Sequence, residues 1–175
     1  PNYYITLGFV YSELKQPDKA KEQYDDALKN LQKNVASVIS TANAFLNRRE
    51  FEYAERTYLK GRELVQGEMF RYYLASVYSY QRNYSSMISE LLLMVKEDEK
   101  ELPKVTSRIK SLLMYDSEES LLDMFKTMVI KQIQLEPDVL AYNRLLIWVF
   151  VEEQNYTQAL RQAMALDRRT RAEDK

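Results

Sequence analysis

Hydrophobic positions recur along the chain at the three- and four-residue spacing that is typical of one face of an α-helix. Near the N-terminus, one such face comprises Tyr4, Leu7, Gly8 and Tyr11. Pro17 follows, and it suits the first turn of a second helix because its missing N–H has no partner there anyway. The second face comprises Ala20, Tyr24, Ala27, Leu28 and Leu31. This pattern predicts two helices joined by a short turn.

The same pattern of side-chain sizes returns about every 34 residues, which indicates an internal repeat. The second copy contains Ala42, Phe45, Ala54, Tyr58 and Gly61, the third contains Ala75, Tyr78, Met87 and Leu91, and the last contains Phe150 and Ala159. The separation of Met87 and Ala159 exceeds two periods of the repeat by about one helical turn. A fourth copy with a short insertion is therefore expected between them.

The repeat predicts an all-α chain of about ten antiparallel helices in five pairs. The expected copies span residues 1–34, 35–67, 68–101, 102–139 and 140–175. The insertion is placed near 115–120, in a polar stretch of the fourth and most degenerate copy, and the fifth copy ends in a basic tail. Because two helices of a tight pair approach most closely where they cross, small residues are expected at the crossing points.

These residues resemble the tetratricopeptide repeat family. The positions that carry the resemblance are Leu7, Gly8, Tyr11, Ala20, Tyr24, Ala27, Ala42, Phe45, Ala54, Tyr58, Ala75, Tyr78, Pro137 and Ala159. The first copy departs from the family pattern at Gln32, where a proline is usual, and the third at Met87, where an alanine is usual. The resemblance implies a right-handed α-α superhelix in which the first helix of each pair lines a concave groove.

The family frame implies which side chains would line that groove. They are Ile5, Phe9, Ser12 and Glu13 in the first copy, Ile39, Ser40, Asn43 and Asn47 in the second, Met69, Tyr72, Tyr73, Ser76 and Tyr80 in the third, and Arg144, Trp148 and Glu152 in the fifth. Tyr offers a rigid ring with a polar tip, and Asn43 and Asn47 share one helix face. We therefore hypothesise a peptide or protein ligand.

A purely structural role stays open for three of these aromatic residues. Tyr72, Tyr73 and Trp148 are also of the kind that fills the space between neighbouring helix pairs. The groove does not resemble that of chaperone-binding tetratricopeptide domains, because the places that would hold a cationic clamp contain Phe9, Ser40 and Tyr73.

The amino-acid composition excludes several kinds of catalytic and metal site. The chain has 0 Cys and 0 His, which excludes thiol nucleophiles, Cys/His zinc sites and imidazole bases. Adjacent carboxylates such as Asp25 and Asp26 point about 100° apart on a helix and do not converge on one cleft. We therefore expect no catalytic residue, no metal and no cofactor. A net charge of −1 also argues against a nucleic-acid partner.

Two triplets, Asn83-Tyr84-Ser85 and Asn155-Tyr156-Thr157, match the N-glycosylation pattern, yet both asparagines fall at the same repeat position and are expected to cap helices. The basic tail, which includes Arg161, Arg168, Arg169 and Arg171, is expected to complement a helix C-terminus, and the alternative is a surface for an acidic partner or for membrane phosphates.

No apolar run reaches the roughly 20 residues that a membrane span requires. The chain begins without Met, so we expect a segment of a longer protein whose targeting signal lies elsewhere. An apolar face formed by Tyr3, Tyr4, Leu7, Val10 and Tyr11 is expected to promote self-association.

The main functional hypothesis is a non-catalytic interaction scaffold. The alternatives are the docking or regulatory part of a larger enzyme or assembly and, less favoured, a helical-repeat RNA binder.

Overall fold

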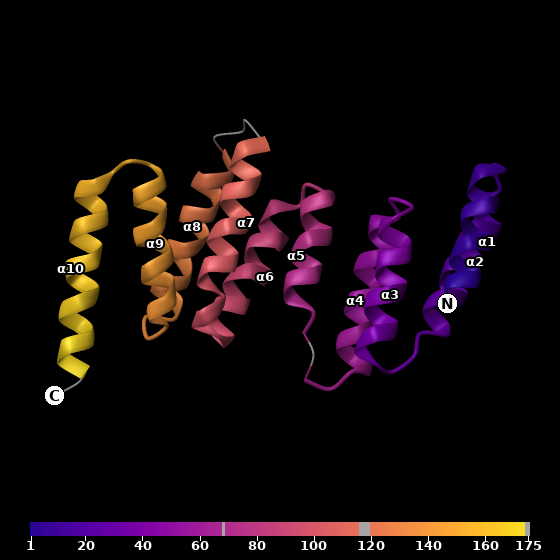
Figure 1. Ribbon diagram of the computed structural model, residues 1–175, viewed down its shortest axis with the longest axis horizontal. Coiled ribbons are helices and arrows are strands. Elements are labelled where there is room, and N and C mark those ends of the chain that lie inside the picture. Colours follow the sequence, from indigo (N-terminus) through magenta and orange to yellow (C-terminus); the bar gives the residue numbers. More distant parts are fainter. Residues whose placement is uncertain (68, 116–119, 174–175) are drawn as a thin grey trace. The chain divides into compact units, whose positions relative to one another are not determined.

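The computed structural model describes residues 1–67, 69–115 and 120–173, which form α-helices, one short 3-10 helix and the turns between them (Figure 1). Contacts divide the chain into two compact units, Pro1–Asn83 and Tyr84–Lys175. In both units, neighbouring helices pack against each other. The predicted all-α helical-repeat architecture is therefore confirmed.

The first unit contains α1 (Asn2–Glu13), α2 (Pro17–Lys29), α3 (Val35–Leu46), α4 (Phe51–Leu64) and α5 (Arg71–Tyr80). Helices α1 and α2 form one antiparallel pair and α3 and α4 the next, while α5 packs against α4. The ring of Tyr24 on α2 lies 5.4 Å from the ring of Phe45 on α3 and 4.9 Å from that of Tyr53 on α4. This aromatic cluster joins the first helix pair to the second.

The second unit contains α6 (Tyr84–Glu97), η1 (Glu99–Glu101), α7 (Leu102–Tyr115), α8 (Ser120–Leu135), α9 (Leu140–Glu152) and α10 (Tyr156–Glu173). Helix α9 lies against α6, α7, α8 and α10, and its Leu145 and Val149 are fully buried. Arg169 on α10 donates to the Pro137 carbonyl oxygen at 2.6 Å and pairs with Asp138 at 2.7 Å. Part of the basic tail therefore fastens α10 to the turn between α8 and α9.

One turn geometry recurs at the repeat spacing. Lys15, Arg49, Arg82 and Gln154 have φ angles of 59°, 62°, 57° and 56°, in the left-handed region. The first three follow each other at one repeat period, and the fourth comes two periods and the short insertion later. After each of them, the next backbone N–H donates to a carbonyl five residues back, as in Gln16 to Tyr11 at 2.9 Å and Glu50 to Phe45 at 3.0 Å. These bonds are those of the Schellman motif, a helix end with one left-handed residue in which orphan carbonyls are satisfied.

The repeat-signature residues fall mostly in the core. The buried ones are Gly8, Ala20, Tyr24, Ala27, Ala42, Phe45, Ala54, Tyr58, Ala75, Tyr78 and Ala159. Leu7 and Tyr11 are half-buried, and Pro137 is exposed in the turn between α8 and α9. At Gly8 the backbones of α1 and α2 approach so closely that an added Cβ would lie 3.1 Å from the Ala20 carbonyl oxygen.

Three further local predictions concern the start of a helix, a helix cap and an insertion. Pro17 is the first residue of α2, as expected. The Asn155 side-chain oxygen accepts a hydrogen bond from the Gln158 backbone N–H at 3.3 Å, which confirms its capping role. The predicted insertion near 115–120 falls mainly on residues 116–119, which lie outside the described residues.

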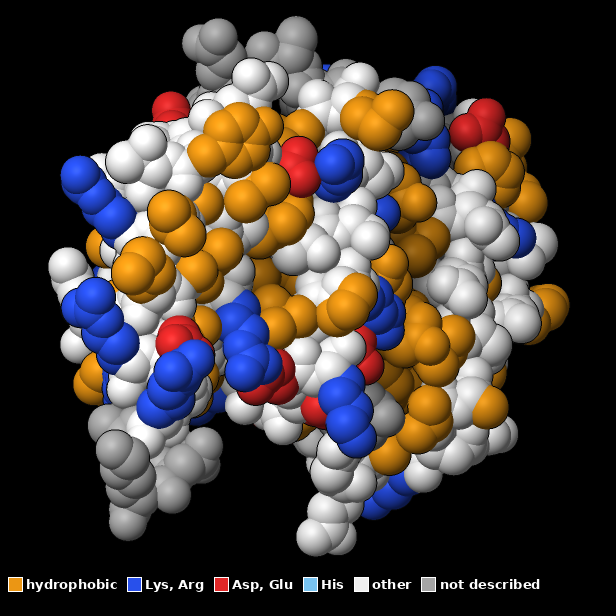
Figure 2. Space-filling model, turned by 60° about the vertical axis from the view of Figure 1, so that its left-hand side comes forward, with side chains coloured by type: hydrophobic (Ala, Val, Ile, Leu, Met, Phe, Trp, Pro, Cys, Tyr) orange, Lys and Arg blue, Asp and Glu red, His pale blue; other side chains and the backbone are white. Residues whose placement is uncertain are grey.

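Both units carry exposed apolar stripes. On α1, Tyr3 is 72% exposed and Val10 45%, whereas Tyr4, Leu7 and Tyr11 of the predicted face are half-buried. On α10, the exposed residues Tyr156, Leu160 and Met164 follow each other at intervals of four. Figure 2 turns the α10 side of the molecule towards the reader and shows apolar side chains interspersed with Lys and Arg.

Among the described helices, none combines the length and apolarity that crossing a membrane would demand.

Candidate functional site

A row of exposed side chains on α1 and α3 forms the best candidate surface. On each helix the row takes one residue every three or four positions, which is one face of a helix. The rows comprise Asn2, Thr6, Phe9 and Glu13 on α1 and Ala36, Ser40, Asn43 and Asn47 along α3 and at its C-cap, and all eight are exposed. Each member of the second row lies one repeat period after its counterpart in the first. We call this surface the α1–α3 face.

The two rows border a common hollow. A cleft of about 590 Å³ lies at the N-terminal ends of the two helices, where Asn2 of α1 meets Ala36 and Ser40 of α3. Tyr3 and Ser37 also line this cleft. Because the cleft contains members of both rows, the rows belong to one side of the first helix pairs.

The amides of Asn43 and Asn47 are available to a ligand. The two residues are exposed, and their side chains make no hydrogen bond with any residue that the structure describes. An Asn amide offers one acceptor and two donor hydrogens, which matches the donor and acceptor pair of a peptide group. Two such amides one helical turn apart can hold the backbone of an extended segment. Ile39, one turn before Asn43, is half-buried beside them.

Arg48 crosses the seam between the two helices. Its Nη1 donates to the Ala44 carbonyl oxygen at 3.0 Å and its Nη2 to Thr6 Oγ1 at 3.0 Å. The guanidinium carbon lies 5.7 Å from the centre of the Phe9 ring. Arg48 therefore places a cation beside the row of amides.

Two tyrosines of the third copy, Tyr73 and Tyr80, pack against α4. The Tyr73 ring stacks on Tyr58 with centroids 5.4 Å apart, and the Tyr80 ring stacks on Phe51 at 5.5 Å. Tyr73 remains 41% exposed and Tyr80 60% exposed, so both pack on α4 and also face outward. Tyr72 and Ser76 are half-buried, and the Ser76 hydroxyl donates to the Tyr72 carbonyl oxygen at 3.0 Å.

Two first-copy residues do not lie where the family frame implies. Ile5 is 0% exposed and belongs to the core, and Ser12 lines a different cleft, beside α2 and α4. The reason is geometric: Ile5 precedes the buried Gly8 by three residues and Ser12 follows it by four, so both share its side of α1.

The fifth-copy residues are engaged inside the second unit. Arg144 pairs with Glu99, and Lys110 pairs with Glu152 at 3.1 Å. The Trp148 ring meets Phe125 edge-on, with centroids 6.0 Å apart. These contacts hold α9 against η1, α7 and α8, so the structural role left open for Trp148 is the one observed.

The site residues that the sequence pattern did not reveal are Asn2, Thr6, Ala36 and Arg48. Thr6 could have been found, because it lies one repeat period before Ser40 and therefore shares its repeat position. Arg48 follows the C-cap residue of α3, and its direction depends on contacts with another helix pair. No spacing rule along one helix predicts such a contact.

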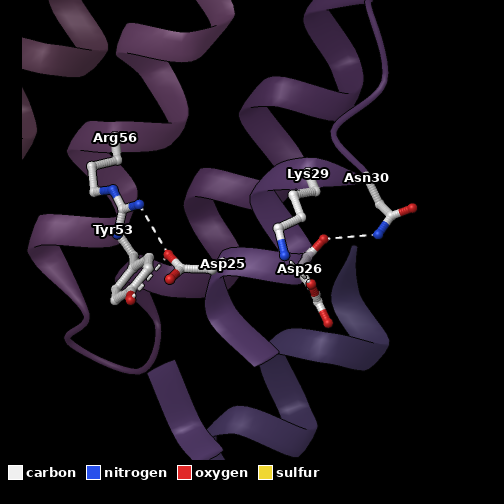
Figure 3. Close-up of polar contacts among 6 residues, drawn as sticks. All are labelled: Asp25, Asp26, Lys29, Asn30, Tyr53 and Arg56. Atoms are coloured by element: carbon white, nitrogen blue, oxygen red, sulfur yellow. Dashed lines mark hydrogen bonds and ion pairs between the residues drawn. The ribbon is translucent and has the colours of Figure 1, made fainter. Parts of the chain in front are cut away.

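A second polar region lies on α2 and α4. Arg56 pairs with Asp25 at 2.9 Å, while Tyr53 donates to the same carboxylate at 3.4 Å. Asp26 pairs with Lys29 at 2.8 Å instead, and Figure 3 shows the two carboxylates directed at different partners. This arrangement links two helices and provides no pair of converging carboxyl groups.

Burial governs the titration of the neighbouring tyrosine. Tyr24 is 3% exposed, and its hydroxyl donates to Glu50 Oε1 at 3.1 Å. Burial, and secondly the charge of Glu50, raise the pKa of Tyr24 well above its usual value of 10.0. The phenol therefore stays neutral and serves as a hydrogen-bond donor between the two helix pairs.

Within the described residues, no group of three or more Asp, Glu, His or Cys side chains is arranged to hold a metal ion. No protein-family model and no curated protein matches the chain. A function is therefore proposed from the residues of the α1–α3 face.

Proposed function

We propose that the chain is a non-catalytic interaction scaffold of the tetratricopeptide type that binds an extended peptide segment on the α1–α3 face. The observation that carries the proposal is the pair of exposed Asn43 and Asn47 amides, which bond to no other described residue and lie in a row of small and polar side chains. Such a row lets a peptide backbone approach closely and still find hydrogen-bond partners.

The neighbouring surface supports the same function. The cleft at Ser40 gives room for a side chain of the ligand, and Phe9 supplies an apolar ring on the same face. Tyr73 and Tyr80 extend the exposed aromatic surface of the first unit. Rigid aromatic rings provide contact area at a low cost in conformational entropy.

The repeated turn supports the family part of the proposal. The left-handed residues Lys15, Arg49 and Arg82 give three turns between successive helices one geometry, once in each repeat period. This regularity is what a tetratricopeptide array requires, because each pair must stack on the next with the same rotation.

Peptide selection tests the proposal. The chain is used to select binders from a random library of short displayed peptides, and the affinity of a selected peptide is measured by fluorescence anisotropy. Replacing both Asn43 and Asn47 by Ala should weaken binding by about tenfold, because two buried peptide groups lose their partners. The matched control is Gln134→Ala, which removes an exposed amide from α8.

Thermal melting establishes that the variants remain folded, which is expected because Asn→Ala on an exposed helix face raises helix propensity. Equal affinities of the double variant and the original chain would remove the α1–α3 face as the binding surface.

A further inference from the structure

We infer that the segment bound on the α1–α3 face is acidic, and that Arg48 holds one of its carboxylates. This inference rests on the proposed function and adds the chemistry of the partner.

Arg48 is held in one place by neutral groups. Its two hydrogen bonds go to a threonine hydroxyl and a backbone carbonyl, and the Phe9 ring lies beside it. The side chain is half-buried, so its conformation is largely fixed before a ligand arrives. A fixed guanidinium loses less entropy on binding than a mobile surface cation would.

Arg48 has no ion-pair partner in the described part of the chain. No carboxylate among the described residues forms an ion pair with it. By contrast, Arg56 lies 2.9 Å from Asp25 and Arg169 lies 2.7 Å from Asp138. A guanidinium has five N–H donors, and the contacts with Thr6 and Ala44 occupy two of them. Donors and charge both remain for an external carboxylate.

The position of Arg48 fits the same ligand as the free amides. It follows Asn47 directly, and its Nη1 reaches back to Ala44, which is adjacent to Asn43 in the chain. A peptide whose backbone bonds to the amides would therefore bring its side chains over the guanidinium. Asp or Glu at that point gains a charge-assisted hydrogen bond, whereas Lys would be repelled.

A single cation favours an acidic peptide over a nucleic acid. Affinity for RNA or DNA comes from many phosphate contacts, each neutralised by a basic side chain. On the α1–α3 face, Arg48 is the cation that faces a ligand. The rows themselves contain one charged side chain, the carboxylate of Glu13. Glu13 also works against an acidic ligand, so Glu13→Gln should tighten its binding by a few-fold.

The first test uses the unmodified chain. Peptides selected from the random library should be enriched in Asp and Glu, and replacing those residues by Gln should weaken binding by roughly tenfold. The advantage of the acidic peptide should shrink as salt is added, because exposed charges are screened. A short single-stranded RNA serves as the competing ligand.

The second test uses variants. Arg48→Gln should abolish the preference for the acidic peptide over its Gln analogue. Arg49→Gln is the matched control, since it removes the same charge from the adjacent, exposed position and should preserve the preference. Thr6→Val should reduce the preference in part, because the hydroxyl positions the guanidinium without touching the ligand.

The outcomes separate the two proposals. If selected peptides need Asn43 and Asn47 but bind equally well with Glu or Gln, the acidic partner is wrong and the scaffold stands. If no peptide is selected, or RNA displaces every peptide, both are wrong. If Arg48→Gln does not fold, the peptide series on the unmodified chain still decides.

Discussion

Gly8 shows how one methyl group can decide whether two helices fit together. Gly8 is buried where α1 crosses α2, and an added Cβ would overlap the ring of Tyr24 and lie 3.1 Å from the Ala20 carbonyl oxygen. In an open helix, Gly→Ala stabilises by about 1 kcal/mol. Overpacking in a filled core costs about 1–3 kcal/mol, and here the obstacle includes a backbone atom.

We therefore expect Gly8→Ala to lower the free energy of unfolding by about 1 kcal/mol, measured by urea denaturation. The double variant with Tyr24→Leu removes the ring and should show a smaller additional cost of the alanine than the single variant does. A stabilised Gly8→Ala chain would show that α1 and α2 can separate without penalty.

At the scale of the element, the recurring turn between helices is set by backbone bonds rather than by its side chains. In these turns the left-handed residues are Lys15, Arg49, Arg82 and Gln154, and none of these four is glycine. A side chain in this conformation costs roughly 1 kcal/mol relative to glycine. The chain tolerates that cost because the helix ends are otherwise satisfied.

Arg49→Gly should consequently stabilise the chain by about 0.5–1 kcal/mol, because it relieves the strain at a φ of 62°. Chemical denaturation measures the change. The control is Arg48→Gly, whose residue does not have positive φ and which should be destabilising. An Arg49→Gly chain that is less stable than the original would mean that the arginine side chain contributes more than its backbone strain costs.

At the scale of the whole molecule, buried tyrosines in both units link stability to alkaline pH. Burial, and secondly Glu136, raise the pKa of Tyr142 to about 12, and burial raises that of Tyr58 above its usual value of 10.0. Above pH 10 the unfolded chain releases phenolic protons that the folded chain retains. The stability present below this pH is therefore lost as the pH rises towards the folded-state values, by about 1.4 kcal/mol per unit of pKa difference.

The tyrosines should leave the melting temperature unchanged just below pH 10 and should lower it between pH 10 and 12. Tyr142→Phe removes one of the titrating groups and should make the fall less steep. A melting temperature that stays level over this interval would show that the phenols ionise freely in the folded chain.

Many of the buried positions in the fold follow from the pattern of small and apolar residues along the helices. The repeat positions of Ala42, Ala54 and Ala75 predicted the buried crossing points, because a small side chain at each crossing lets two helix axes approach closely. The direction of Arg48 could not be predicted, since it depends on Thr6, which is 42 residues away in the chain. The packing of Tyr73 on α4 is of the same kind, because ring stacking depends on the partner helix and not on the repeat frame.

The uniform turn geometry also offers a practical handle. Because side chains as different as Lys, Arg and Gln occupy the four equivalent turn positions, a further residue type should be accepted there. The chain has 0 Cys, so cysteines introduced together at positions 15 and 49 would be the two thiols available for labelling. A fluorophore and a quencher at these two positions would report whether the first two helix pairs move apart when a peptide binds.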